Sequence, residues 1–153
     1  MVFGNGEQVS TVAGRLASGR DPLLALEGLD YEPDPPIFTP RLTVIADNRE
    51  GGEAWFGAAR RSTGDRSATN RLTLHVSALA PGEGVLMTTY HSDGQEIATG
   101  APFLEIRTTA ETRGDLLDEL WAALSPQLRI AAAFFTPGDL TNSGIRHASR
   151  TRV

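Results

Sequence analysis

Residues 41–91 have the sequence RLTVIADNREGGEAWFGAARRSTGDRSATNRLTLHVSALAPGEGVLMTTYH. Four segments within it are rich in the β-branched, aromatic and other apolar residues that strands favour: RLTVIA (41–46), EAWFGAARR (53–61), RLTLHVSAL (71–79) and GVLMTTYH (84–91). The residues between them are mainly Gly, Asp, Asn and Ser, which suit hairpin connections. The stretch therefore predicts a run of antiparallel strands joined by short turns.

Helical patterns precede these strands. After a strand-like opening at VFG, apolar residues recur at helical spacing within residues 7–19: Val9, Val12, Ala13 and Leu16. Gly19 is a typical helix stop, and Asp21 followed by Pro22 predicts the start of a second helix. We therefore expect a strand stub, a glycine turn and a helix pair before the first long strand.

The C-terminal third combines another helix with further strands. PFLEIRT (102–108) is strand-like, and residues 111–125 carry an apolar stripe of period 3.6 that ends at Pro126. RIAAAFFT (129–136) is typical of a buried strand, and IRHASRTRV (145–153) is expected to pair back on it. Helices on both sides of antiparallel strands predict an α+β fold, which we expect to form one domain over residues 1–153.

The charged residues limit the chemistry and the partners of the chain. The net charge is −5, and all 14 basic residues are arginine. Without lysine the chain can form neither a Schiff base nor the lysine-containing phosphate loop, so an anion would be held by guanidinium groups. The acidic balance argues against nucleic-acid binding. No apolar run is long enough for a membrane span, and no secretory signal opens the chain.

Metal and cofactor sites are not expected either. There is no cysteine, and the three histidines, His75, His91 and His147, lie far apart without zinc-ligand spacing. No glycine fingerprint for a dinucleotide and no serine-hydrolase motif is present. We therefore expect no metal and no cofactor. The absence of cysteine fits a cytoplasmic location.

Two segments carry candidate chemistry. The first, GNGEQ (4–8), places Asn5 and Gly6 between a strand stub and a helix start, where unpaired backbone N–H groups favour an anion or a carbonyl oxygen. The alternative is a plain strand–helix turn with Asn5 as its cap.

The second segment, LDYEPDPPIFTPR (29–41), has four prolines within eight residues. These exclude a helix or a central strand and predict a stiff, extended loop. The loop carries acidic, hydroxyl and guanidinium groups: Tyr31, Glu32, Asp34, Thr39 and Arg41. Rigidly held groups of these kinds suit positional acid–base catalysis, because two nearby carboxylates can differ in pKa. The alternative is a solvated acidic loop in which Arg41 pairs with one carboxylate.

Together these segments resemble the archaeal-type IMP cyclohydrolase family and its bacterial relatives. The family's Ser-Asn-Gly turn corresponds to Gly4-Asn5-Gly6, and its acidic, proline-rich loop to Tyr31–Asp34 and Phe38-Thr39-Pro40-Arg41. Its Thr-Tyr-x-x-Asp-Gly segment and later Gly-x-Pro resemble Thr89, Tyr90, Asp93, Gly94, Gly100 and Pro102. The chain departs from the family at Gly4, which replaces its serine. It also looks N-terminally truncated, because the family carries an upstream segment with arginine and asparagine.

The resemblance implies a fold and a reaction. The fold would be a layered α/β/β/α sandwich like that of N-terminal-nucleophile hydrolases, with antiparallel sheets. The reaction would be ring closure of 5-formamidoimidazole-4-carboxamide ribonucleotide to IMP with loss of water, in purine biosynthesis. No cofactor is needed. Open sheet edges left by missing strands would favour a homo-oligomer or a partner chain that supplies them.

The resemblance also suggests residue roles. Glu32 or Asp34 would be the acid–base group, and Tyr31 and Arg41 would orient that base or the formyl oxygen. The substrate-binding residues would be Asn5, Gly6, Thr39 and Tyr90. These roles require the acidic loop to fold back over the asparagine turn around one nucleotide-sized pocket. Two other interpretations are a non-catalytic relative that binds a purine nucleotide, and an interaction module that pairs through its open sheet edges.

Overall fold

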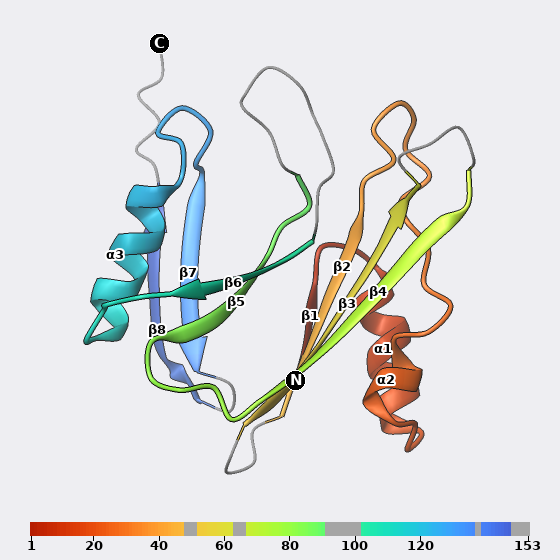
Figure 1. Ribbon diagram of the computed structural model, residues 1–153, viewed down its shortest axis with the longest axis horizontal. Helices are drawn as coiled ribbons and strands as arrows, with labels where there is room; N and C mark the ends of the chain where they lie inside the picture. The colour runs from red at the N-terminus through yellow and green to blue at the C-terminus, as the bar shows by residue number, and fades with distance from the viewer. Residues whose placement is uncertain (48–51, 63–66, 91–101, 137–138, 148–153) are drawn as a thin grey trace. The chain divides into compact units, whose positions relative to one another are not determined.

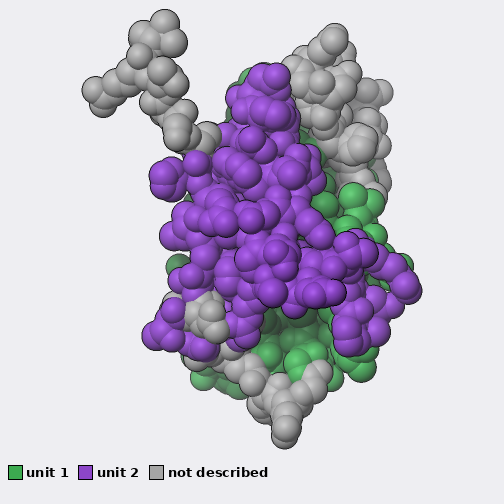
Figure 2. Space-filling model, turned by 90° about the vertical axis from the view of Figure 1, so that its left-hand side faces the viewer, with its two compact units in different colours: residues 1–79, 85–106 green, residues 80–84, 107–153 purple. Residues whose placement is uncertain are grey.

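The computed structural model describes residues 1–47, 52–62, 67–90, 102–136 and 139–147 (Figure 1). Asp93, Gly94 and Gly100, which carry part of the family resemblance, lie outside the described residues. The chain divides into two compact units, coloured in Figure 2, and each is described by itself. Unit 1 comprises residues 1–79 and 85–106, and unit 2 comprises residues 80–84 and 107–153.

A four-stranded antiparallel sheet forms the centre of unit 1. Its strands are β1 (Val2–Gly4), β2 (Arg41–Ala46), β3 (Glu53–Arg61) and β4 (Thr69–Ser77), in that spatial order. β3 pairs with β2 from Arg41↔Ala59 to Ala46↔Ala54 without a register shift. β1 pairs with the other side of β2, so residues from the N-terminus lie directly beside residues 41–46.

Two helices cover one face of this sheet. They are α1 (Gln8–Ala17) and α2 (Pro22–Ala25) (Figure 1). α1 ends as predicted, because Gly19 adopts a φ of 82° and its N–H bonds the carbonyl of Leu16. The side chain of Asp21 accepts a hydrogen bond from the Leu23 N–H at 2.9 Å, which confirms it as the N-cap of α2.

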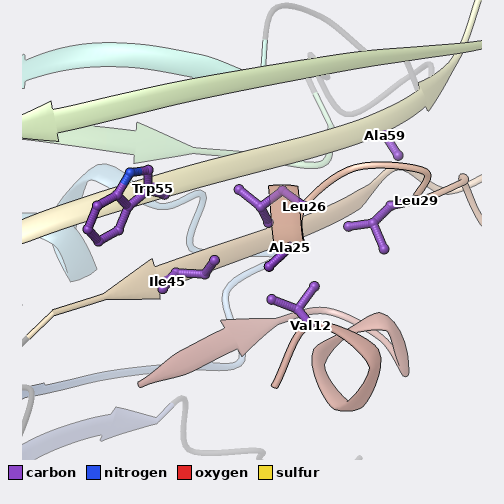
Figure 3. Packing of buried hydrophobic residues seen from close by; sticks show 7 residues of the cluster. All are labelled: Val12, Ala25, Leu26, Leu29, Ile45, Trp55 and Ala59. Atoms are coloured by element: carbon purple, nitrogen blue, oxygen red, sulfur yellow. The ribbon is translucent and has the colours of Figure 1, made fainter. Parts of the chain in front are cut away.

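The buried core of unit 1 lies between these helices and the sheet (Figure 3). It consists of apolar residues from both helices, the segment after α2 and the two central strands: Val12, Ala25, Leu26, Leu29, Ile45, Trp55 and Ala59. Gly57 lets Leu26 approach the sheet, since a Cβ at Gly57 would lie 2.8 Å from Leu26 Cδ2. The stripe predicted for α1 is correct for Val12 but wrong for Ala13, which is exposed.

Two shorter strands follow the four-stranded sheet. β5 (Glu83–Met87) and β6 (Phe103–Arg107) form a separate two-stranded sheet. Within unit 1, the Phe103 ring meets the Phe56 ring edge-on, with 6.3 Å between the centroids. Phe56 alternates with Trp55 along β3, so it points away from the face that the helices cover.

Unit 2 is built from one helix and one hairpin. α3 (Arg113–Ala123) begins with a capping box between Thr112 and Asp115. It packs on the antiparallel strands β7 (Ala131–Thr136) and β8 (Asp139–His147), with Leu117 2% exposed at their contact.

Two expectations for this C-terminal region are wrong. Residues 131–136 alternate between exposed and half-buried rather than forming a buried strand. Of the apolar stripe predicted for residues 111–125, Leu117 is buried, but Leu120 and Leu124 are 38% and 44% exposed. The expectation that residues from Ile145 onward pair back on residues 129–136 is confirmed as far as His147, in a strand that begins earlier, at Asp139.

The predicted fold class is confirmed at the level of a mixed α+β chain with antiparallel sheets. The layered sandwich and the single family domain over residues 1–153 stay predictions. Every helix of the described residues is too short or too polar to cross a bilayer.

The contact between Leu26 and Gly57 predicts how the stability of unit 1 changes when leucine side chains in and just after α2 are shortened. Leu26→Ala is expected to lower the free energy of unfolding by about 2–4 kcal/mol, because it removes a buried side chain without refilling its space. Leu24→Ala, two residues earlier within α2 and at a position 48% exposed, is the matched control. Its loss should stay within about 0.5 kcal/mol. Urea denaturation followed by circular dichroism measures both, and equal losses would contradict the packing described.

Candidate functional site

The proline-rich loop is closed on itself by its own backbone. The Glu32 N–H donates to the Thr39 carbonyl at 2.9 Å, so the two ends of the loop are paired. Between them, the N–H groups of Ile37 and Phe38 both donate to the Asp34 carbonyl. Phe38 has a φ of 53°, a left-handed conformation that this tight turn imposes. The loop is therefore ordered, as its prolines predicted, but the prediction that it is extended is wrong, because these bonds close it into a turn.

The neighbouring strands fix the loop from outside. Arg71 on β4 donates to the Leu29 carbonyl, and Thr69 on β4 bonds the Asp30 carboxylate. The Arg61 guanidinium at the end of β3 lies over the Phe38 ring, 4.2 Å from its centroid. These contacts place the loop at the end of the sheet where β2 begins.

Tyr31 takes part in this fixation. Its hydroxyl donates to the Ser67 carbonyl at 2.9 Å, and its ring meets Phe38 edge-on at 5.8 Å. The phenol hydrogen is therefore already used, and in this arrangement Tyr31 could face a ligand only through an oxygen lone pair. A role for Tyr31 in orienting the base or the formyl oxygen stays a prediction.

Asp34 is bound on both carboxylate oxygens. The backbone N–H of Thr39 donates to Oδ1 at 2.7 Å, and the Thr39 hydroxyl donates to Oδ2 at 2.6 Å. The Thr39 hydroxyl, and then the Thr39 backbone N–H, lower the pKa of Asp34 because they stabilise its charged form. An ionised carboxylate whose oxygens are both engaged is suited to holding the loop rather than to exchanging protons.

Glu32 has a different environment. Arg41, the first residue of β2, bonds its Oε2 through Nε at 2.7 Å and through Nη2 at 2.6 Å. The other oxygen of Glu32, Oε1, has no partner among the described residues, and the side chain is 38% exposed. The Arg41 side chain is only 18% exposed. Glu32 is thus a carboxylate with one oxygen fixed and one oxygen open to a ligand.

Asn5 joins the turn after β1 to this loop. Its Nδ2 donates to the Pro40 carbonyl and its Oδ1 accepts from the Leu42 N–H, each at 2.8 Å. Gln8 adds a weaker bond to the same Oδ1 at 3.3 Å. The acidic loop and the asparagine turn therefore lie together, as the sequence predicted. The alternative in which Asn5 caps the helix is wrong, because the N-cap of α1 is Glu7 and the Asn5 side chain bonds the backbone at the start of β2 instead. One Nδ2 hydrogen is left for a ligand.

The glycines beside Asn5 leave little room for side chains. A Cβ at Gly4 would lie 2.6 Å from the Leu42 carbonyl oxygen and 2.7 Å from Val9 Cγ2. A Cβ at Gly6 would lie 2.6 Å from Gln8 Oε1 and 3.8 Å from Arg41 Nε. Gly4, which replaces the serine of the resembled family, therefore fits a junction in which a serine side chain would need the backbone to shift.

Thr39 and Tyr90 are in contact. Their hydroxyl oxygens lie 3.1 Å apart, and Tyr90 is 36% exposed. This contact brings the segment after β5 to the proline-rich loop, so all eight residues singled out from the sequence belong to one connected region of unit 1. The nucleotide-sized pocket itself stays a prediction.

Two residues of this region were missed by the sequence analysis. Gln8 is 3% exposed and donates to the Leu42 carbonyl at 3.0 Å. A polar residue four positions before Val12, on the apolar face of a predicted helix, was the available signal. Glu7 lies 3.5 Å from Arg41 Nη2 and is 85% exposed. No pattern in the sequence distinguishes it from an ordinary surface acid.

The region has the features of a site that works by positioning and proton transfer. It combines a guanidinium-held carboxylate and a hydroxyl group on the closed proline-rich loop with the Asn5 amide on the adjoining turn. Among the described residues, no group of three His, Asp or Glu side chains is arranged to hold a metal ion.

A comparison with protein families identifies the family to which the chain belongs. Residues 1–137 match the family described as IMP cyclohydrolase-like protein. The chain belongs to this family. Membership supports a function related to purine biosynthesis and to cyclohydrolase chemistry. No curated protein and no solved structure matches the chain.

The lowered pKa of Asp34 predicts a pH dependence of stability. Ionised Asp34 stabilises the native state only, so its contribution is fully present above its ordinary pKa of 3.8 and is lost as the pH falls through the lower native pKa. Asp34→Asn removes this ionisation. The stability difference between wild type and Asp34→Asn, measured by urea denaturation, should therefore shrink from about pH 6 to about pH 2. A difference that is constant over this range would contradict the role given to the carboxylate.

Proposed function

We propose that the chain closes the ring of 5-formamidoimidazole-4-carboxamide ribonucleotide to give IMP and water. Membership of the IMP cyclohydrolase-like family supports this reaction class. The observation that carries the proposal is the Glu32–Arg41 pair, which holds one carboxylate oxygen and leaves the other open on a rigid loop. The ligand would be a purine ribonucleotide precursor, held at the junction of the asparagine turn and the acidic loop.

The reaction needs two proton transfers and one new bond. The carboxamide nitrogen forms a bond to the formyl carbon of the same molecule and gives up a proton, while the formyl oxygen takes one. The resulting hydroxyl then leaves the ring carbon as water, with a second proton lost from a ring nitrogen. Two hydrogens and one oxygen are released in total, and no electrons are exchanged with a cofactor. Orientation and a positioned proton acceptor are sufficient for such an intramolecular step.

We assign the proton acceptor to Glu32 rather than to Asp34. Glu32 Oε1 is open, whereas both oxygens of Asp34 are engaged by Thr39. Arg41 orients Glu32 and supplies a positive charge close to the developing oxygen charge of the intermediate. The remaining hydrogen of the Asn5 amide and the backbone at Gly6 would contact the carboxamide or the formyl group.

The same family supports two structural proposals. The apolar side of β3 that carries Phe56 would face a second layer, as in the layered sandwich of N-terminal-nucleophile hydrolases. A second copy or a partner chain would then cover the remaining sheet edges. Neither proposal is needed for the assignment of Glu32.

The specific observation that favours a second function is the glycine junction. The resembled family has serine at the position of Gly4, and a Cβ there would lie 2.6 Å from the Leu42 carbonyl oxygen. If the missing hydroxyl is required for turnover, the chain is a non-catalytic relative that binds a purine nucleotide. Binding of the formamido nucleotide without formation of IMP would support this alternative.

The assignment of Glu32 predicts a selective loss of turnover. Glu32→Gln keeps the size of the side chain but removes the proton acceptor, so the rate of IMP formation should fall by about 10²–10⁴-fold. Affinity for the formamido nucleotide, measured by calorimetry, should change much less. The reaction is followed by the absorbance of IMP.

Glu27→Gln is the matched control for this experiment. Glu27 is an exposed glutamate of the same unit, five residues before Glu32 and outside the loop. Its substitution should leave turnover within about twofold of wild type. If Glu32→Gln retained wild-type turnover, the assignment of the acid–base group would be wrong.

A further inference from the structure

Three groups in the candidate site form a chain of hydrogen bonds. The Tyr90 hydroxyl lies 3.1 Å from Thr39 Oγ1, and Thr39 Oγ1 lies 2.6 Å from Asp34 Oδ2. Among the described residues, the hydroxyl oxygen of Tyr90 has no other polar partner. Tyr90 is 36% exposed. Its hydroxyl is therefore the end of this series of hydrogen bonds that is open to a ligand.

The direction of this chain follows from counting hydrogens. Ionised Asp34 can only accept, so the single hydroxyl hydrogen of Thr39 points to Oδ2. Thr39 then has no hydrogen left for Tyr90, and the Tyr90 hydroxyl must donate to Thr39. The lowered pKa of Asp34 keeps the carboxylate ionised at neutral pH, which fixes this direction. The Tyr90 oxygen is left with lone pairs alone.

We propose that the Tyr90 oxygen is a hydrogen-bond acceptor that selects a ligand group with fixed N–H donors, namely the carboxamide –NH2 of the nucleotide. The inference rests on the proposed function and specifies which group of the substrate Tyr90 contacts. A ribose hydroxyl can either donate or accept, so the polarity of Tyr90 would not select it. A carboxamide nitrogen can donate a hydrogen bond but cannot accept one. An acceptor at Tyr90 therefore distinguishes the carboxamide –NH2 from a hydroxyl group.

The selection also fits the direction of the reaction. The carboxamide nitrogen is the nucleophile, and it carries two hydrogens. An acceptor at Tyr90 would hold one N–H while the open oxygen of Glu32 takes the other proton. Tyr90 is then a substrate-contacting residue. Its preference for a ligand N–H donor is determined by Asp34, two hydrogen bonds away.

An isosteric substitution at Asp34 is expected to reverse the direction of both hydrogen bonds. In Asp34→Asn, the side-chain oxygen must still accept the Thr39 backbone N–H, which places the amide –NH2 against Thr39 Oγ1. The amide then donates to Thr39, Thr39 donates to Tyr90, and the Tyr90 hydrogen points outward. Tyr90 becomes a donor, which favours a ligand acceptor over a ligand donor.

The test compares two nucleotides that differ at one group. These are 5-aminoimidazole-4-carboxamide ribonucleotide and the corresponding 4-carboxylate, with affinities for the full chain measured by calorimetry. Wild type should prefer the carboxamide. Asp34→Asn should move the affinity ratio toward the carboxylate, and the reversed polarity of Tyr90 should contribute a factor of about ten to this shift, the equivalent of one hydrogen bond.

A double-mutant cycle separates polarity from charge. Asp34→Asn also removes a negative charge, which by itself favours a carboxylate ligand. In a Tyr90→Phe background the charge effect persists but the polarity effect cannot occur, so the shift in the ratio should be about tenfold smaller than in the presence of Tyr90. Thr39→Ser, which keeps the hydroxyl, should preserve the wild-type preference. Equal shifts with and without Tyr90 would overturn the inference.

A spectroscopic measurement tests the direction without any nucleotide. The chain has two tyrosines, so Tyr31→Phe leaves Tyr90 as the single reporter. The intensity ratio of the tyrosine doublet in ultraviolet resonance Raman spectra distinguishes a donating from an accepting phenol. It should indicate a donor at Tyr90 and should change on Asp34→Asn. A phenol that accepts from Thr39 would overturn the inference alone, whereas failure of wild type to bind either nucleotide would contradict the proposed function.

Discussion

The Asn5 carboxamide is the contact on which the rest of the candidate site depends. β1 ends at Gly4, opposite Thr43, so it does not extend to the Pro40 carbonyl and the Leu42 N–H at the start of β2. Asn5 substitutes for a strand residue by donating to the Pro40 carbonyl and accepting from the Leu42 N–H. Unpaired, these buried backbone groups would destabilise the fold, so the asparagine turn and the end of the proline-rich loop are held together.

From this junction, strand register decides where the charged groups lie. Arg41 is the first residue of β2 and pairs across from Ala59, so its side chain leaves the sheet on the same face as that of Ala59. Leu42, on the opposite face, is buried and anchors the strand. The loop must close between Glu32 and Thr39 to reach this position, which brings the Glu32 carboxylate to Arg41. The ion pair is thus a consequence of loop closure and register together.

Local signals in the sequence were sufficient for the elements but not for the roles of their residues. The Asp21–Pro22 start of α2 and the Gly19 stop of α1 act within a few residues, so they could be predicted. Exposure depends on what lies opposite: Ala13 and Leu120 sit on predicted apolar stripes, yet no neighbouring element of their unit buries them. The grouping of the loop with the asparagine turn came from the family resemblance, whereas the different environments of the two loop carboxylates depend on the closed turn, which no sequence pattern indicates.

A comparison of the two loop carboxylates shows why composition alone could not assign them. Glu32 and Asp34 are two residues apart in the same loop, but one meets a guanidinium on a single oxygen and the other is bound twice by Thr39. The second arrangement needs a backbone N–H and a hydroxyl of one residue to reach both oxygens, which only a closed turn provides. The prolines stabilise that closed turn by limiting its alternatives. Rigidity of the loop is therefore what allows one carboxylate to fix hydrogen-bond direction while its neighbour stays open for proton transfer.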